Sequence, residues 1–533
     1  MVFDNKSHIP PRLDIHTQCA YYFIVIQILV NSEMEWYCIK KLLGLLYAAA
    51  MGITLALLLF WEHLDYIYKR EFALSNAALL ALDAAALALL AGAVCLARRK
   101  GTPFLGPRAA KAGRVLMAAV LFGAQLALCL NNLFEAGWDV AGIVESTRVL
   151  ANGGVLQHDY YSMYPNNLMS VYLYGTVSLL LRATGLWETI GFPVDIAAFS
   201  VLNCALSSLT GVLLWRCARH MTQSTGAADA VWLLYAALIG LSPWLIVPYS
   251  DSLSLLFPTL LLFISLRPFR RSWARWALLG GVGALAYAVK PQGAVMLIAV
   301  VLGRLVCDVL PAWRRRAPGS LRRWAVAGVA LCLTAAVCLG LTAGLAPLFG
   351  FELEPEEALG ASHFLMMGLN EETNGSYYRW DVSYSVSFPT RWERMKANID
   401  LALHRVLWMG PGGLALHGAK KALVNFNDGT FAWKMDGGER FSISDGPVFP
   451  AEHELLWSTA LQALWLGVLG GCLLYAFAAA DRDSVTLRLC LLGVMAMVML
   501  FECRARYLYA NVPIFILAAV LGVRGVAARL RRQ

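Results

Sequence analysis

Runs of mostly apolar residues, each about 20 residues long, recur along nearly the whole chain. A helix of about this length is needed to cross the ~30 Å hydrocarbon layer of a bilayer, where every backbone polar group must be paired internally. The composition agrees, because 59% of the residues are hydrophobic and only 15% are charged. The chain is therefore predicted to be an all-α polytopic membrane protein, and a soluble globular fold is excluded.

The apolar runs predict twelve membrane spans, at 44–61, 72–96, 115–133, 194–216, 227–248, 251–267, 276–290, 293–308, 324–348, 455–478, 485–501 and 507–526. Lys and Arg concentrate in four segments, at 97–114, 267–276, 304–324 and 524–532. Since short cytoplasmic loops collect these residues, twelve spans place all four segments and both termini in the cytoplasm. The net charge of +9 then reflects topology, and no nucleic-acid partner is needed to explain it.

The first outer loop is predicted to run over 134–193 and to contain two helices lying in the membrane interface. The apolar run 168–181 is shorter than the ~17 residues that a span requires. Residues 140–152 have one apolar face at helical spacing, made of Val140, Ile143, Val144, Thr147 and Ala151. The second long outer segment, 350–454, is the longest polar stretch and is predicted to form a small extracytoplasmic cap.

Four segments follow from this topology. Residues 1–40 are an N-terminal extension, either upstream of an alternative start at Met34 or forming a peripheral amphipathic segment. Residues 41–349 form a membrane domain, and 350–454 form the cap. Residues 455–533 hold the last membrane helices and a basic cytoplasmic tail.

Charged residues gather at the predicted outer boundary of the membrane, where charge is expensive and usually paired or functional. They are Asp139, Asp159, Asp251, Lys290, Glu502, Arg504 and Arg506, with Tyr507 beside the last of them. Each has a structural alternative: the acids as helix caps or turn residues, the cations as lipid anchors, and the nearby tyrosines as an aromatic belt.

Several motifs resemble those of the GT-C superfamily of membrane glycosyltransferases. Asp139, then Asp159-Tyr160-Tyr161 and Tyr164-Pro165-Asn166-Asn167, resemble the first outer loop of its protein O-mannosyltransferase and aminoarabinose-transferase branch, which is like glycosyltransferase family 39. Lys290-Pro291 and Glu502 to Tyr507 resemble other recurrent features. The closer resemblance is to little-characterised bacterial integral membrane members, which share Tyr-Pro-Asn-Asn, His363–Asn374 and Asn427-Asp428-Gly429-Thr430-Phe431. The branch usually has an acidic pair where this chain has Asp139 followed by Val140.

The resemblance implies transfer of a sugar, with inversion, from a polyprenyl-phosphate donor to an acceptor glycan, lipid or protein. The reaction would take place on the outer face of the cell membrane. A phosphate leaving group needs nearby positive charge, which Lys290, Arg504 and Arg506 would supply together with Tyr507. Asp139 is the expected catalytic base. Asp159 is the second catalytic candidate, and Asp251, Glu502, Tyr161 and Asn166 are expected to support the site. No cofactor follows with certainty, and a divalent cation is left open because three aspartates occur without a DxD pattern.

Two other classes of protein stay open. Twelve spans also suit a lipid or sugar transporter or flippase, whose charges would line a path near the bilayer midplane. A non-catalytic cell-envelope assembly protein could use its outer cap to bind a polymer. Neither the sugar nor the acceptor follows from the sequence.

Overall fold

The computed structural model describes residues 32–64, 72–99, 107–156, 158–314, 317–433, 440–443, 451–478 and 481–530. Most of the predicted N-terminal extension therefore lies outside the described residues. The described part is mostly helical, as predicted. Two short strands, β1 (Phe134–Ala136) and β2 (Arg440–Ser442), form one antiparallel pair in which Glu135 faces Phe441.

The helices that coincide with the predicted spans are α2 (Ser32–Phe60), α3 (Asn76–Arg99), α4 (Pro107–Leu130), α9 (Val194–Thr222), α10 (Thr225–Tyr235), α12 (Leu256–Leu266), α13 (Ser272–Val289), α14 (Val295–Arg304), α16 (Pro318–Ala343), α22 (Ala451–Tyr475), α23 (Arg482–Leu500) and α24 (Val512–Leu530). The described ranges also contain the α-helices α5 (Trp138–Ala151), α6 (Asp159–Met163), α7 (Leu168–Ala183), α8 (Leu186–Ile190), α11 (Ser250–Ser254), α15 (Leu310–Arg314), α17 (Leu345–Leu348), α18 (Gly360–Gly368), α19 (Arg379–Val386) and α20 (Arg391–Phe426). Single turns of 3-10 or π-helix are η1 (Glu62–Leu64), η2 (Pro165–Asn167), η3 (Ala236–Gly240), η4 (Pro243–Ile246), η5 (Pro291–Ala294), η6 (Leu305–Val309), η7 (Pro355–Glu357) and the longer η8 (Ala505–Asn511).

Eight helices in the described ranges are long and apolar enough to cross a membrane. They run over Ile39–Phe60, Arg108–Leu130, Val194–Thr222, Pro291–Trp313, Gly319–Leu348, His453–Tyr475, Arg482–Leu500 and Ala505–Leu530. The other four predicted spans coincide with helices that are shorter or less apolar, namely α3, α10 with η3, α11 with α12, and α13. Several membrane spans are thus confirmed, whereas the number twelve stays a prediction.

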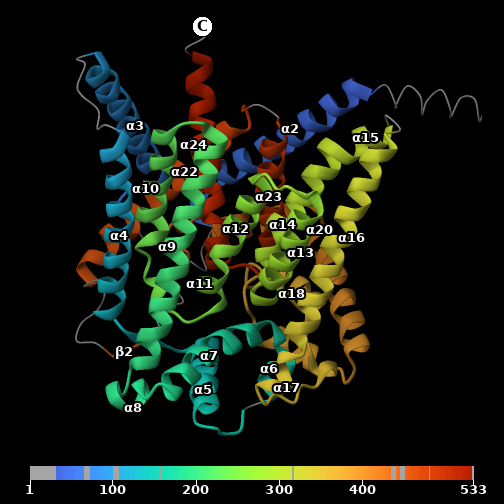
Figure 1. The fold of residues 1–533 in the computed structure, drawn as a ribbon. Coiled ribbons are helices and arrows are strands. Elements are labelled where there is room, and N and C mark those ends of the chain that lie inside the picture. Colours follow the sequence, from blue (N-terminus) through green and yellow to red (C-terminus); the bar gives the residue numbers. More distant parts are fainter. Residues whose placement is uncertain are drawn as a thin grey trace, which may run out of the picture.

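The first outer loop forms a separate layer at one end of the bundle. Helices α5 to α8 and α17 gather there, at the end opposite to the C-terminus (Figure 1). Helices α5 and α7 overlap the two predicted helical segments, 140–152 and 168–181, and pack against each other. The predicted apolar face of α5 is confirmed, because Val140, Ile143, Val144, Thr147 and Ala151 are all buried. That these helices lie in the membrane interface stays a prediction.

The segment predicted as an outer cap is more deeply integrated than a cap would be. Helix α20 spans 36 residues and bends at Gly410, whose φ of 59° is followed by Pro411. Beyond the bend, α20 packs against α2 and α23, and its residues from Lys421 to Phe426 are buried. The chain therefore leaves the outer layer and enters the helix bundle well before residue 454.

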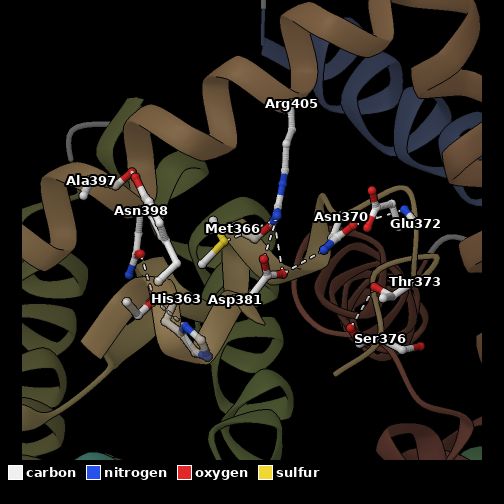
Figure 2. Close-up of polar contacts among 12 residues, drawn as sticks. His363, Met366, Asn370, Glu372, Thr373, Ser376, Asp381, Ala397, Asn398 and Arg405 are labelled. Atoms are coloured by element: carbon white, nitrogen blue, oxygen red, sulfur yellow. Dashed lines mark hydrogen bonds and ion pairs between the residues drawn. The ribbon is translucent and has the colours of Figure 1, made fainter. Parts of the chain in front are cut away.

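The outer part of this segment is a small packed unit of α18, α19 and the first half of α20 (Figure 2). Arg405 of α20 pairs with Asp381 of α19 at 2.6 Å and donates to the backbone oxygen of Met366 in α18 at 2.6 Å. His363 bonds through Nδ1 to Ser385 Oγ at 2.7 Å, and Ser385 donates to Asn398. These contacts tie the three helices together, which gives the His363–Asn374 motif a structural role.

The motif Asn427 to Phe431 forms a buried loop among the helices. Asn427 Oδ1 accepts hydrogen bonds from Asn76 at 2.8 Å and from Gln462 at 3.0 Å. Trp244 Nε1 donates to the backbone oxygen of Phe431 at 3.1 Å. A Cβ at Gly429 would lie 2.4 Å from the backbone oxygen of Leu461, so the backbone approach excludes any side chain there. This loop joins α20 to α3 and α22 and has a structural explanation of its own.

Candidate functional site

Three breaks in the helical backbone meet at one point. Asp251 lies on α11, Lys290 lies between α13 and η5, and Arg506 lies on η8. Lys290 has extended backbone angles, φ −161° and ψ 123°, because the following proline disfavours helical geometry at the residue before it. The break that the sequence predicts at Lys290 is therefore confirmed.

Asp251 is shared between the two cations. Its Oδ1 is ion-paired with Lys290 Nζ, and its Oδ2 lies 3.8 Å from Arg506 Nε. The three side chains are almost completely buried, with 1% of Asp251, 9% of Lys290 and 11% of Arg506 exposed. Burial of charges in this arrangement is costly unless each is compensated, so Asp251 is the residue that allows both cations to sit here.

Aromatic rings surround Arg506. Its guanidinium carbon lies 4.4 Å from the ring centre of Trp138, 5.5 Å from that of Tyr249 and 5.6 Å from that of Tyr507. Trp138 has a φ of 44°, a left-handed conformation that costs roughly 1–3 kcal/mol for a residue other than glycine. Such strain persists only where the surroundings enforce it, and here it holds the indole ring against the guanidinium.

Asp139 stands at the edge of this group, in the first turn of α5, and is partly exposed. Its Oδ2 accepts a hydrogen bond from the Tyr249 hydroxyl at 3.1 Å. The Tyr160 hydroxyl lies near Asp139 and accepts a hydrogen bond from Asn167 at 2.7 Å. Tyr249 thus orients the Asp139 carboxylate, and the Tyr249 ring also contacts Arg506, while part of the carboxylate stays accessible.

Glu502 and Arg504 complete the group. Burial raises the pKa of Glu502, and Asp139 adds to this effect, whereas Arg506, a hydrogen bond from Tyr507 and Arg504 act in the opposite direction. Asp139, Asp251, Lys290, Glu502, Arg504 and Arg506 are called the charge cluster below. The cluster combines three cations with two buried carboxylates, and Asp139 lies at its rim.

Three of the residues selected from the sequence lie elsewhere. Asp159 is exposed at the start of α6, and no hydrogen bond or ion pair joins it to the charge cluster in the part of the chain described. Tyr161 is buried and donates to Ser146 Oγ at 2.8 Å, so it braces α6 against α5. Asn166 is exposed and contacts only its neighbour Asn167, at 3.4 Å. Tyr160, which was not selected from the sequence, lies near Asp139.

The three aspartates do not converge on one point. Asp251 pairs with Lys290 and lies near Arg506, Asp139 bonds to Tyr249, and Asp159 is exposed. Across the described ranges, no group of three or more His, Cys, Asp or Glu side chains is placed to hold a metal ion.

Sequence reasoning missed the aromatic residues Trp138, Tyr160 and Tyr249. Trp138 and Tyr249 flank the selected Asp139 and Asp251 closely in sequence, which could have drawn attention to them. The φ of Trp138 has no local sequence signal, because tryptophan is not expected in that conformation.

Neither the curated proteins nor the solved structures gave a match to this chain. A family model described as "conserved hypothetical integral membrane protein" matches residues 36–526, which include every residue of the charge cluster. With several helices able to span a bilayer and a match over most of its length, the chain belongs to this family of conserved hypothetical integral membrane proteins.

Proposed function

We propose that this protein is a membrane glycosyltransferase that moves a sugar from a polyprenyl-phosphate donor to an acceptor hydroxyl outside the cytoplasmic membrane. One observation carries the proposal: the partly exposed carboxylate of Asp139 accepts a hydrogen bond from Tyr249, whose ring in turn lies against the buried cations Lys290 and Arg506. The resemblance of the surrounding motifs to GT-C glycosyltransferases supports the donor class.

The cations fit the leaving group. As the bond between the anomeric carbon and the phosphate oxygen breaks, negative charge develops on the phosphate, and preorganised cations stabilise it. Arg506 can bind two phosphate oxygens at once. Asp251 keeps Arg506 and Lys290 in place before the donor arrives, so little reorganisation is needed during the reaction.

Asp139 fits the role of base. A carboxylate in hydrogen-bond reach can accept the proton of the acceptor hydroxyl as the oxygen attacks the anomeric carbon. Tyr249 holds the carboxylate through a hydrogen bond. A single displacement of this kind would invert the anomeric centre.

The distribution of basic residues supports an extracytoplasmic site. Lys40, Arg275, Arg323 and Arg529 come from four different helices and line one cavity, at the opposite end of α13 from Lys290. Because short cytoplasmic loops are rich in Lys and Arg, that end is assigned to the cytoplasm. The charge cluster then faces the outside, with both termini inside.

The base is tested with purified protein in nanodiscs, supplied with a panel of radiolabelled polyprenyl-phosphate sugars. Asp139→Asn keeps the shape of the side chain and should lower turnover by about 10²–10⁴-fold while expression is retained. Glu145→Gln is the matched control, because it removes an exposed carboxylate from the same helix, α5, and its turnover should stay near wild type. Near-normal turnover in Asp139→Asn would show that Asp139 is not the catalytic base and is only an acidic residue in the first turn of α5.

The phosphate site is tested separately by binding of a non-hydrolysable polyprenyl-phosphate analogue. Lys290→Gln and Arg506→Gln should each weaken binding strongly, because each removes a cation that the phosphate would meet. The exposed Arg379→Gln serves as the control. Equal affinity in all four proteins would leave Lys290 and Arg506 as structural ion pairs and remove the main support for the transferase.

A further inference from the structure

A second charged site lies far from the charge cluster. A cavity of about 1460 Å³ opens between α2, α13, α16, α23 and α24; we call it the basic cavity. Arg275, near the start of α13, lines it, whereas Lys290 follows the end of the same helix. At 1.5 Å of rise per residue, the two sites are about 22 Å apart.

The basic cavity carries a large excess of positive charge. Eight of the side chains that line it are basic and one is acidic, Asp308. The basic residues that matter most to the argument are Lys40, Lys41, Arg275, Arg304, Arg482 and Arg488. Asp308 reaches Arg304 at 3.2 Å and Arg482 at 3.7 Å, and Asp483 reaches Arg482 at 3.4 Å. These two carboxylates are outnumbered by the eight basic side chains, so most of the positive charge is uncompensated.

Membrane topology alone does not explain this charge. The basic residues that set membrane topology are needed only in exposed loops. Arg304 and Arg488, in contrast, lie within helices and are 7% and 2% exposed. Arg488 is six positions beyond Arg482, the first residue of α23, which places it about 9 Å into the helix. Buried cations at this depth are expected to meet an anion.

Arg488 has a hydrogen-bond donor available to bind an anion. Its Nη2 donates to the backbone oxygens of Ala478 at 2.8 Å and Tyr475 at 3.1 Å, at the end of α22. Its buried Nε has no hydrogen bond to any residue in the described part of the chain. Buried polar groups are nearly always paired, so this atom also indicates a missing partner.

The shape of the cavity indicates what kind of anion would enter. Its volume of about 1460 Å³ exceeds the usual ~300–1,000 Å³ of a small-molecule pocket and is far larger than one phosphate requires. Leu45 and Phe477 line it as well and are 58% and 53% exposed. Apolar surface at the margin and cations inside together match a phosphate that is attached to hydrocarbon chains.

We propose that the basic cavity binds a phosphate group, carried by an anionic phospholipid of the adjoining leaflet. Basic pockets between membrane helices recognise lipid headgroups in this way. The phosphate would take the position between Arg304, Arg482 and Arg488, and the acyl chains would lie along the exposed side chains of α2. This site is independent of the proposed transferase site.

The test uses the purified full-length protein in detergent, with binding of phosphatidylglycerol and phosphatidylcholine followed by native mass spectrometry. Wild type should prefer phosphatidylglycerol. Each basic side chain near a membrane surface contributes about fivefold to the affinity for anionic lipid, so Lys40→Gln/Arg482→Gln should weaken phosphatidylglycerol binding by about 25-fold. Both residues are at least partly exposed, so their replacement should leave the fold intact.

The matched control is Arg270→Gln/Arg271→Gln, which removes two exposed charges that precede α13 at the same end of the bundle but do not line the cavity. Its affinity should stay within about twofold of wild type, as no lipid phosphate contacts it. Equal losses in the two double variants, or no preference for phosphatidylglycerol, would refute the site.

A competition experiment identifies the source of the phosphate. Retention of phosphatidylglycerol in excess inorganic phosphate supports the lipid. Displacement by inorganic phosphate, lost in Lys40→Gln/Arg482→Gln but kept in the control, would refute the lipid and assign the cavity to a soluble phosphate. Arg488→Gln extends the test to the buried position, with thermal unfolding of the same sample confirming that the variant is folded.

Discussion

Replacing Asp251 with Asn should destabilise the protein strongly, because it removes a fully buried carboxylate that contacts both Lys290 and Arg506. The separation of 3.8 Å between Asp251 Oδ2 and Arg506 Nε corresponds to about 4 kcal/mol of attraction at an effective dielectric constant of about 20. Removing one member of a buried ion pair typically costs about 3–5 kcal/mol, since the remaining charge is left uncompensated. We expect a loss in this range.

The free energy of unfolding of the purified protein, measured by titration with SDS in bicelles, reports this loss. Asp159→Asn is the control: it makes the same chemical change at an exposed position and should alter stability by no more than about 0.5 kcal/mol. The double variant Asp251→Asn/Lys290→Met should regain part of the loss, because neighbouring groups couple by about 0.5–3 kcal/mol.

Comparison of these variants decides whether Asp251 compensates the two cations. If Asp251→Asn costs no more than Asp159→Asn, then Asp251 does not compensate the two cations, and the structural basis of the charge cluster is wrong. If the double variant is no more stable than Asp251→Asn, then Lys290 is not the group left uncompensated.

Three further predictions follow from single positions. Gly429→Ala should destabilise by several kcal/mol in the same assay, because its Cβ would lie 2.4 Å from a backbone oxygen; Gly113→Ala, with nothing within 4 Å, should be neutral or slightly stabilising. Burial lowers the pKa of His363 from 6.5 to about 4, so stability should be full above pH 6.5 and fall by about 3 kcal/mol as the pH drops to 4; His363→Gln should remove that slope. In intact cells, a cysteine replacing the exposed Glu371 should react with an impermeant thiol reagent, and one replacing the exposed Arg322 should not; the reverse pattern would invert the topology.

Sequence reasoning succeeded where the signal is local. The buried face of α5 follows from helical periodicity, and the break at Lys290 follows from the proline after it. The selection of Asp251, Lys290 and Arg506 as neighbours rested on topology, which brings the ends of successive spans to the same boundary.

The differences arise where tertiary contacts decide. Residues 350–454, which include the second half of α20, were predicted to form an outer cap because they make up the longest polar stretch. In the folded protein, the Lys421 amine donates to the backbone oxygens of Gly368 and Phe501 at 2.7 Å each, which compensates its burial. Tyr160 and Tyr161 are adjacent on a short helix, and only the packing of α6 determines which of the two reaches Asp139.

The three backbone breaks have a consequence beyond the side chains that they carry. Helices running over Ser250–Leu266, Pro291–Trp313 and Ala505–Leu530 all begin at the charge cluster, and α5 begins there with Trp138. The aligned peptide dipoles of each helix place about half a positive elementary charge at its N-terminus. Four such ends surround the same small volume, so the backbone itself adds positive potential to that of Lys290, Arg504 and Arg506. An anion at this point would be held partly by peptide groups that no side-chain substitution removes, and replacing one cation would weaken its attraction without abolishing it.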